Sequence, residues 1–256
     1  MAIIPWNKKY TETLAVSLQR FRIENPQYRD SKITYAGRLD PMAEGLVVLL
    51  TNNDVHKKQE FLIHDKTYRV EFIFGIATDS YDILGLITRY DESSDLSTAK
   101  IHAALCVIGK ITQQEYPIYS SKTVSGKPLW QWAREGLVDT ITIPSRNIEI
   151  SDIKYIGKRI SGKQEFTPYI QKTIAQVEGD FRQLAILSSW ERYFQESDRA
   201  QYTIHNIEVS ASSGTYIRSL IQTLGQHLGT SAVSIKITRI RVGKYHLKEI
   251  DKSIDK

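Results

Sequence analysis

The distribution of apolar positions along the chain predicts an alternation of strands and helices. Residues 46–50 form a continuous apolar run, which is typical of a short strand buried on both faces. Within residues 66–75, apolar side chains occupy every second position, which predicts a strand with one strongly buried face. Further strands are expected over residues 85–90, 148–155, 204–209 and 233–237.

Helices are predicted from apolar spacing and from residues that begin or end a helix. Thr11 is expected to cap a helix that runs to about Glu24. Ser97 is expected to cap a second helix, which ends at Gly109. Residues 212–225 carry the signature of a helix start, followed by apolar residues on one side.

A long helical pattern over residues 167–196 is interrupted once, at Gly179. Polar loops flank it, which indicates an insertion at about residues 158–200. The pattern fits helices that pack on the domain's own surface, and it also fits a helix that binds a partner.

Together these elements predict one α+β domain over residues 1–245, with a mixed, mostly antiparallel sheet flanked by helices and loops. Residues 246–256 are polar and are expected to form a C-terminal tail. Residues 113–136 are polar and aromatic, with a turn at Ser125 and a short helix after it. A long loop of this kind inside a compact domain usually carries function.

Composition narrows the class of protein. A net charge of +5 and a pI near 9.1 permit a polyanionic partner, and 14 tyrosines suit the stacking of unpaired bases. Cys106 is the only cysteine, which excludes an internal disulfide and a multi-cysteine metal site, and its apolar neighbours predict a buried thiol. No signal peptide and no run of 18 apolar residues is found, so we expect a cytoplasmic protein without a membrane span.

The candidate for reactive chemistry is Asp40, in the turn-rich loop before the buried strand at 46–50. It directly precedes Pro41, which holds it extended, and Arg38 stands two positions upstream. Its carboxylate could cap a turn or act as a nucleophile. Asp79 and Asp82 could form a carboxylate pair, but aspartate is also common in turns.

The other familiar catalytic motifs are excluded by inspection. The sequence has no phosphate-binding glycine loop, no GxSxG motif and no histidine spacing typical of zinc. No metal or cofactor is therefore expected.

Four segments resemble motifs of the TruB family, and they occur in that family's order: AGRLDPMAEGLVVLL, KTYRVEFIFGIATDSYDILG, YPIYSSKTVSGKPLWQWAREG and SSGTYIRSLIQTLG. The family consists of pseudouridine synthases that act on uridine 55 in the T loop of tRNA. The resemblance implies the pseudouridine synthase fold, no cofactor, a monomer, and the T stem-loop of tRNA as partner.

The resemblance also implies roles for individual residues. Asp40 matches the family's nucleophile, and Arg218 matches the arginine expected to pair with it. Tyr68 matches a tyrosine that stacks on the target base and could help to remove the C5 proton. Ile237 matches a leucine that lines the pocket. Three basic residues of the 113–136 loop, which grips RNA in the family, are candidate phosphate contacts: Lys122, Lys127 and Arg134.

The chain departs from the family pattern at three places. Tyr35 stands where the family has a histidine that fills the space of the flipped base, and Tyr can stack in the same way. Arg38 replaces a small residue and matches an arginine that helps to flip the nucleotide in other pseudouridine synthases. The insertion has no clear family counterpart, and the tail is too short for the C-terminal RNA-binding (PUA) domain of many relatives.

Three alternatives to a tRNA pseudouridine-55 synthase stay open at this stage. They are an RNA-binding protein or tRNA folding chaperone that retains the fold, a synthase with another RNA target, and a carbohydrate-active enzyme that uses Asp40. The absence of an obvious second carboxylate and the basic loop speak against the last of these.

Overall fold

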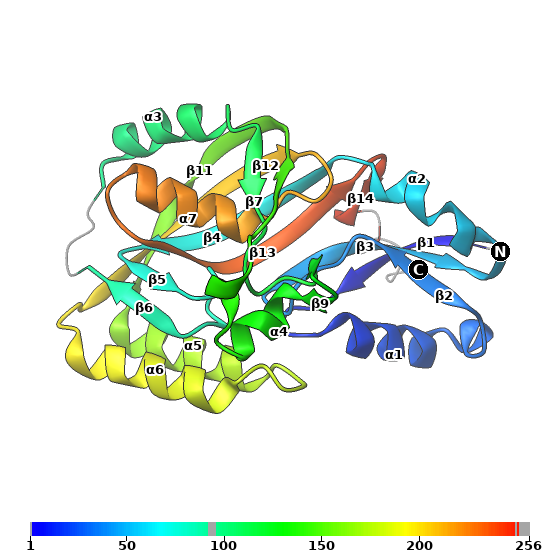
Figure 1. The fold of residues 1–256 in the computed structure, drawn as a ribbon, viewed down its shortest axis with the longest axis horizontal. Helices are drawn as coiled ribbons and strands as arrows, with labels where there is room; N and C mark the ends of the chain where they lie inside the picture. The colour runs from blue at the N-terminus through cyan, green and yellow to red at the C-terminus, as the bar shows by residue number, and fades with distance from the viewer. Residues whose placement is uncertain (1, 92–95, 249, 251–256) are drawn as a thin grey trace.

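An eight-stranded sheet runs through the molecule, which the computed structural model describes over residues 2–91, 96–248 and 250 (Figure 1). Its strands are β1 (Ala2–Lys8), β2 (Ile33–Ala36), β3 (Ala43–Thr51), β4 (Lys66–Phe74), β11 (Ile150–Gly162), β12 (Gln201–Ala211), β13 (Ala232–Val242) and β14 (Tyr245–His246). The order along the sheet is β1-β3-β13-β4-β12-β11, with β2 paired to β3 and β14 to β13. Among these eight described strands, β3 and β13 are the one pair that runs in parallel, so the predicted mixed, mostly antiparallel α+β fold is confirmed.

The pattern of apolar residues explains how the central strands are placed. In β3, Val47 and Leu49 contact one apolar core while Leu46 and Val48 contact another, which confirms a strand buried on both faces. In β4, every second side chain from Tyr68 to Phe74 enters the first of these cores, as the alternation predicts.

Helices cover both faces of the sheet (Figure 1). On one face α3 (Thr98–Ile108) and α7 (Ile217–His227) pack on β4, β11 and β13. On the other lie α5 (Lys163–Ala175) and α6 (Gln183–Glu196). The remaining helices are α1 (Leu14–Glu24), α2 (Lys58–Leu62) and α4 (Leu129–Arg134), with 3-10 turns η1 (Pro26–Tyr28), η2 (Asn52–Lys57) and η3 (Val138–Thr140). None of the helices in the described ranges has the length and apolar character needed to cross a membrane.

The predicted helical insertion forms two helices, α5 and α6, separated by a loop that contains Gly179. Phe166 and Trp190 from these helices pack with Ile73 and Ile235 of the sheet. The insertion therefore packs on the domain's own surface, which was one of the two interpretations of its periodicity.

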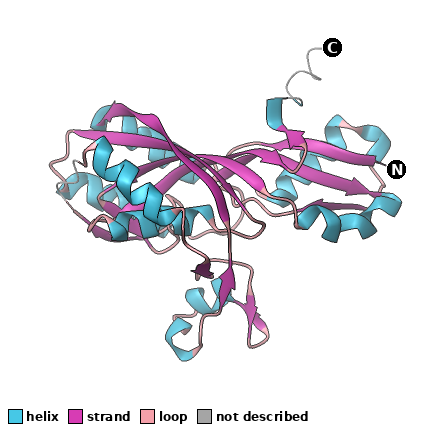
Figure 2. Cartoon of the chain, turned by 90° about the horizontal axis from the view of Figure 1, so that it is seen from above, coloured by secondary structure: helices cyan, strands magenta, loops and turns pink. Residues whose placement is uncertain are grey.

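A small unit projects from the body between α3 and β11. Figure 2 shows it standing away from the sheet, at the position of α4 and β9 at the front of Figure 1. It contains α4, η3 and two small two-stranded antiparallel sheets, which are β7 (Gln113–Glu115) with β10 (Ser145–Asn147) and β8 (Thr123–Val124) with β9 (Lys127–Pro128). A third small sheet, β5 (Ile76–Thr78) with β6 (Ile87–Tyr90), follows β4.

Three local predictions were wrong. The cap of α1 is Thr13, whose side chain accepts from Val16 N, whereas Thr11 has a left-handed backbone with φ of 68°. Cys106 is exposed, because Leu105 and Ile108 face the core and the thiol points to the other side of α3. Helix α7 begins after Tyr216 and has no side-chain cap.

Candidate active site

A cavity of about 760 Å³ opens beside Asp40. It is lined by the loop before β3, by β4 and β13, by the turn at residues 80–84, by the projecting unit, by the α5–α6 loop and by the start of α7. Cavities of this size commonly hold small ligands or single nucleotides.

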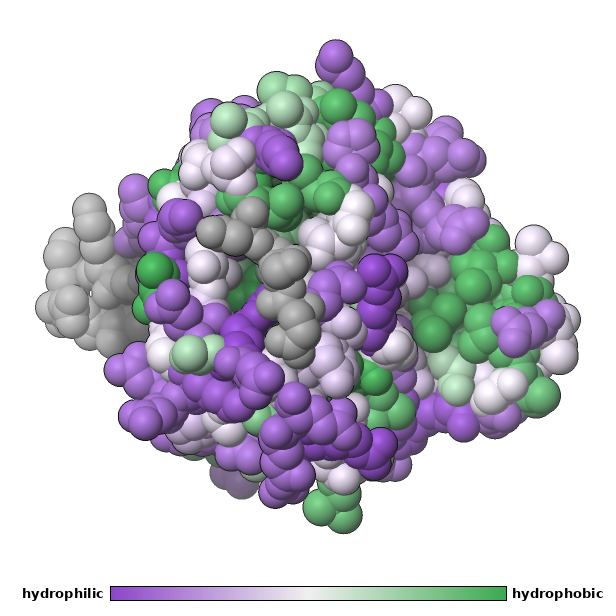
Figure 3. Space-filling view, turned by 90° about the vertical axis from the view of Figure 1, so that its left-hand side faces the viewer, coloured by the Kyte–Doolittle hydropathy of each residue, from purple (hydrophilic) through white to green (hydrophobic). Residues whose placement is uncertain are grey.

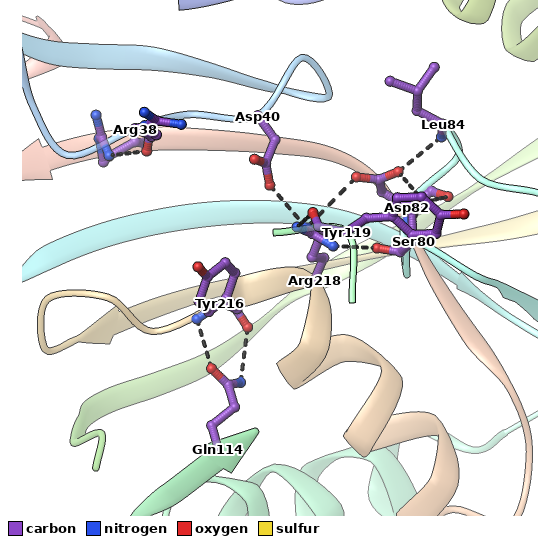
Figure 4. A network of polar contacts seen from close by, with 10 residues as sticks. Arg38, Asp40, Ser80, Asp82, Leu84, Gln114, Tyr119, Tyr216 and Arg218 are labelled. Carbon is purple, nitrogen blue, oxygen red and sulfur yellow. Dashed lines mark hydrogen bonds and ion pairs between the residues drawn. The ribbon is translucent and has the colours of Figure 1, made fainter. Parts of the chain in front are cut away.

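Asp40 and Arg218 form an ion pair in this cavity (Figure 4). Arg218 Nε donates to Asp40 Oδ2 at 2.9 Å, which confirms the predicted pairing. The Arg218 side chain is 3% exposed, whereas that of Asp40 is 47% exposed. The carboxylate is therefore accessible to a ligand while its partner is fixed in the protein interior.

Two main-chain carbonyls hold the other end of the guanidinium. Arg218 Nη1 donates to Ser80 O at 2.6 Å and Nη2 donates to Tyr119 O at 2.8 Å. Charge-assisted bonds of this kind orient a guanidinium strongly. Asp40 is thus aimed by an arginine that is itself held by two distant segments.

A second carboxylate, Asp82, lies behind the pair, with Oδ2 4.0 Å from Arg218 Nε (Figure 4). Its Oδ1 accepts from Ser80 Oγ at 2.7 Å and from Leu84 N at 3.0 Å. Burial raises the pKa of Asp82 to about 6, although Arg218 opposes the shift. The sequence suggested Asp82 only as one of a pair with Asp79, and its position behind Arg218 was missed.

The start of α7, which carries Arg218, is fixed by a side chain from the projecting unit. Gln114 Nε2 donates to Tyr216 O at 3.0 Å, and Tyr216 N donates to Gln114 Oε1 at 2.8 Å (Figure 4). These two bonds fix Tyr216, the residue directly before the helix, and satisfy its N–H, which has no partner within the helix.

Arg239, on β13, holds the loop that carries Asp40 from beneath. It is 1% exposed and donates to the carbonyls of Leu46, Arg38 and Gly37 at 2.6, 3.2 and 3.1 Å. Burial lowers the pKa of Arg239, and the nearby Tyr68 opposes this shift. Arg239 belongs to a basic run in the sequence with Arg241 and Lys244, and nothing in that run indicates a buried residue.

Glycine is required where β3 meets β13. Gly45 has φ of 98°, and a Cβ there would lie 2.5 Å from the carbonyl oxygen of Arg239. The close approach lets β3 pair with β13 directly after the Asp40 loop.

Some of the predicted site residues line the cavity and others do not. Four of the predicted residues line it together with Asp40 and Arg218, and they are Arg38, Tyr68, Arg134 and Ile237. Three others lie outside the described lining, and they are Tyr35, Lys122 and Lys127. Arg38 Nη1 donates to Ser121 Oγ at 2.7 Å, which joins the Asp40 loop to the projecting unit.

The three predicted phosphate contacts differ in their surroundings. Lys127 pairs with Glu135, and Arg134 pairs with Asp180 at 2.6 Å. Lys122 Nζ lies 5.1 Å from the centre of the Tyr116 ring. Their role in binding stays a prediction.

The surface of the projecting unit is partly apolar, as the hydrophobic patch on the right of Figure 3 shows. Trp130 and Leu137 are each 40% exposed there. Exposed aromatic and aliphatic side chains beside basic residues suit contact with unstacked bases. Within the described ranges, no three His, Cys, Asp or Glu residues are grouped so that they could hold a metal ion.

Comparison with known proteins gives a family match. The model of the TruB family pseudouridylate synthase (N-terminal domain) matches residues 25–172, which is more than half of the chain. A tRNA pseudouridine synthase B of Lactobacillus delbrueckii subsp. bulgaricus is 32% identical over 225 residues, covering 86% of this chain and 62% of the relative. The Syntrophus aciditrophicus tRNA pseudouridine synthase B is 29% identical, covering 85% of this chain and 55% of the relative. The chain thus spans about three fifths of the length of these relatives.

Solved structures share the fold. A Cbf5-Nop10-Gar1 complex contains a chain that matches with a TM-score of 0.58 at 16% identity, over 96% of this chain and 50% of its own length. A chain of an H/ACA RNP bound to a substrate RNA containing 2'-deoxyuridine matches with a TM-score of 0.54 at 15% identity, over 96% of this chain and 49% of its own. At this identity the likeness concerns the fold.

Proposed function

Because the chain belongs to the TruB family of pseudouridylate synthases, we propose that it isomerises uridine to pseudouridine in tRNA, with uridine 55 of the T loop as target. The observation that carries this proposal is the ion pair between the buried Arg218 and the accessible Asp40 at the wall of a nucleotide-sized cavity. The names of the matched relatives support tRNA as the substrate.

In the proposed reaction the uracil N1–C1′ bond breaks, the base turns, and C5 bonds to C1′. Asp40 attacks the sugar or the base and is later released, as a carboxylate does in retaining glycosidases. The C5 proton is lost and N1 gains a proton, so the reaction needs no oxidant and no water. The hydrogen bond from Arg218 Nε fixes the direction of the Asp40 carboxylate.

Other side chains in the cavity would bind the flipped nucleotide. Tyr68 and Ile237 line the wall on β4 and β13 and would hold the base, and Tyr68 would stack on it. Arg38 would assist flipping from the Asp40 loop. The projecting unit would grip the RNA stem-loop, with Lys122, Lys127 and Arg134 near its phosphates.

We place the catalytic domain at residues 1–245, with residues 158–200 as an insertion in it. The protein would act as a monomer in the cytoplasm, without a cofactor.

The test uses a T-loop RNA stem-loop labelled with tritium at uridine C5. The wild-type protein should release tritium to water, and Asp40→Asn should bind the RNA about equally well but release none. An RNA-binding protein or folding chaperone would release no label in either form while binding the RNA. A transfer RNA panel with single uridine substitutions would then identify the modified position.

A further inference from the structure

The loop between α5 and α6 reaches the cavity that contains Asp40. Asp180, Phe181 and Arg182 from this loop are part of the cavity wall. The helices on either side of the loop pack against the opposite face of the sheet from α7, which carries Arg218. The insertion therefore extends from that face of the sheet to the cavity that contains Asp40.

Arg182 joins two segments that line the cavity. Its Nη1 donates to Asp79 Oδ2 at 2.8 Å and its Nη2 donates to Asp79 Oδ1 at 3.3 Å. Its guanidinium also lies 4.2 Å from the centre of the Tyr119 ring. The side chains of Arg182 and Asp79 are 20% and 16% exposed, so solvent screens their attraction less than at an open surface.

The same two segments supply the carbonyls that hold Arg218. One acceptor is Ser80 O, in the residue next to Asp79, and the other is Tyr119 O. A displacement of Asp79 or Tyr119 therefore moves an acceptor of Arg218. The direction of Arg218 Nε toward Asp40 changes with it, because the guanidinium is planar and rigid.

The backbone of Arg182 has an unusual conformation. Its φ is 64°, a left-handed conformation that residues with a Cβ seldom adopt. Such outliers persist where the surroundings hold them, and they are frequent at functional sites. Here the residue is held by its side-chain contacts to Asp79 and Tyr119 and by its main chain at the start of α6. Its N donates to Asp180 Oδ1 at 3.4 Å, and its O accepts from Ile186 N at 3.0 Å.

We propose that Arg182 is a positioning residue for the catalytic ion pair, so that the helical insertion completes the active site. Arg182 acts by fixing Asp79 and Tyr119, whose neighbouring carbonyls orient Arg218 toward Asp40. This inference rests on the function proposed above and extends it to the residues of the insertion.

The test compares Arg182→Ala and Arg182→Lys with Arg192→Ala, a matched change of an exposed arginine on α6. Single-turnover conversion of the T-loop RNA is measured at saturating enzyme, together with RNA affinity. Arg182→Ala should lower the rate constant of conversion about tenfold or more. The fraction of RNA converted and the affinity for RNA should stay as in the wild type. The rate constant of Arg182→Lys should lie between those of the wild type and Arg182→Ala, because an ammonium keeps the charge but loses the paired bonds to Asp79 and the contact with the Tyr119 ring. Arg192→Ala should match the wild type.

Two outcomes of this assay would overturn the inference. One is a wild-type rate constant in Arg182→Ala. The other is a lower amplitude at an unchanged rate constant, which would show only a loss of folded protein.

A measurement independent of turnover separates this inference from the proposed function. The ¹⁵N-detected Nε–H resonance of Arg218 should shift or broaden in Arg182→Ala and stay in place in Arg192→Ala. An unchanged resonance in Arg182→Ala rejects the positioning role even if the wild type is inactive on the RNA. Lack of activity in the wild type would by itself count only against the proposed function.

Discussion

Arg218 Nε lies 2.9 Å from Asp40 Oδ2, across 178 positions of the chain. The arginine is buried and bound by two carbonyls, whereas the aspartate exposes about half of its side chain. The pair thus combines a fixed cation with an accessible carboxylate. This arrangement suits a nucleophile that must stay ionised and still reach a substrate.

Replacing Arg218 with lysine should separate charge from geometry. Lysine keeps a positive charge, but one ammonium cannot reach Asp40, Ser80 O and Tyr119 O in the fork geometry of a guanidinium. We expect Arg218→Lys to lower the single-turnover rate by about 100-fold, the typical effect of losing one preorganised donor. RNA affinity, measured by filter binding, should change little. A rate close to that of the wild type would show that charge alone is sufficient.

The elevated pKa of Asp82 predicts a specific dependence of stability on pH. The folded-state pKa is about 6 and the unfolded value is about 4, so the folded protein keeps a proton that the unfolded chain loses between them. The free energy of unfolding should therefore fall as pH rises from about 4 to about 6, by on the order of 2 to 3 kcal/mol. Asp82→Asn should remove this component. Urea denaturation of both proteins at several pH values would test it, and parallel curves would contradict it.

The sequence predicted the parts of the fold that depend on local pattern. The apolar run at 46–50 could only be satisfied by burial on two faces, and the alternation in β4 set which face carries Tyr68. The pairing of Asp40 with Arg218 was predicted through the family resemblance, since nothing local to either residue indicates the other.

The missed residues depend on the packing of distant segments. Arg239 belongs to a basic run, but β13 lies inside the sheet, so its side chain is buried under the Asp40 loop. Asp82 lies in a turn, where aspartate is common, and only the packing of that turn on Arg218 gives it a place in the site. Arg182 belongs to an insertion, and its contact with Asp79 could not be read from helical periodicity.

Tyr68 can be tested for a role beyond stacking. Its side chain lines the cavity beside Asp40, so its phenol oxygen is a candidate to accept the C5 proton. We expect Tyr68→Phe to retain RNA binding, because the ring is kept, and to release tritium about 100-fold more slowly. Tyr68→Leu should lose the same step and bind more weakly. Normal tritium release by Tyr68→Phe would restrict the residue to stacking.

The basic residues of the projecting unit should contribute unequally to RNA affinity. Each phosphate contact makes log affinity fall more steeply with log salt and adds about 0.7 to 0.9 to the magnitude of the slope. Lys127 pairs with Glu135 in the protein, and RNA must compete with that carboxylate, whereas Lys122 lies against the Tyr116 ring. Lys122→Ala should therefore reduce the magnitude of the slope by nearly the value of one full phosphate contact. Lys127→Ala should reduce it by less.

Glu135→Gln is the matched control for this prediction, because it removes the competing carboxylate and leaves Lys127 in place. It should tighten RNA binding at low salt. Lys127→Ala made in the Glu135→Gln protein should then reduce the magnitude of the salt slope as much as Lys122→Ala does. Titration of a labelled T stem-loop at several salt concentrations gives the slope for these four variants and for the wild type. Equal slopes for Lys122→Ala and Lys127→Ala in the presence of Glu135 would show that the ion pair does not limit the contact with RNA.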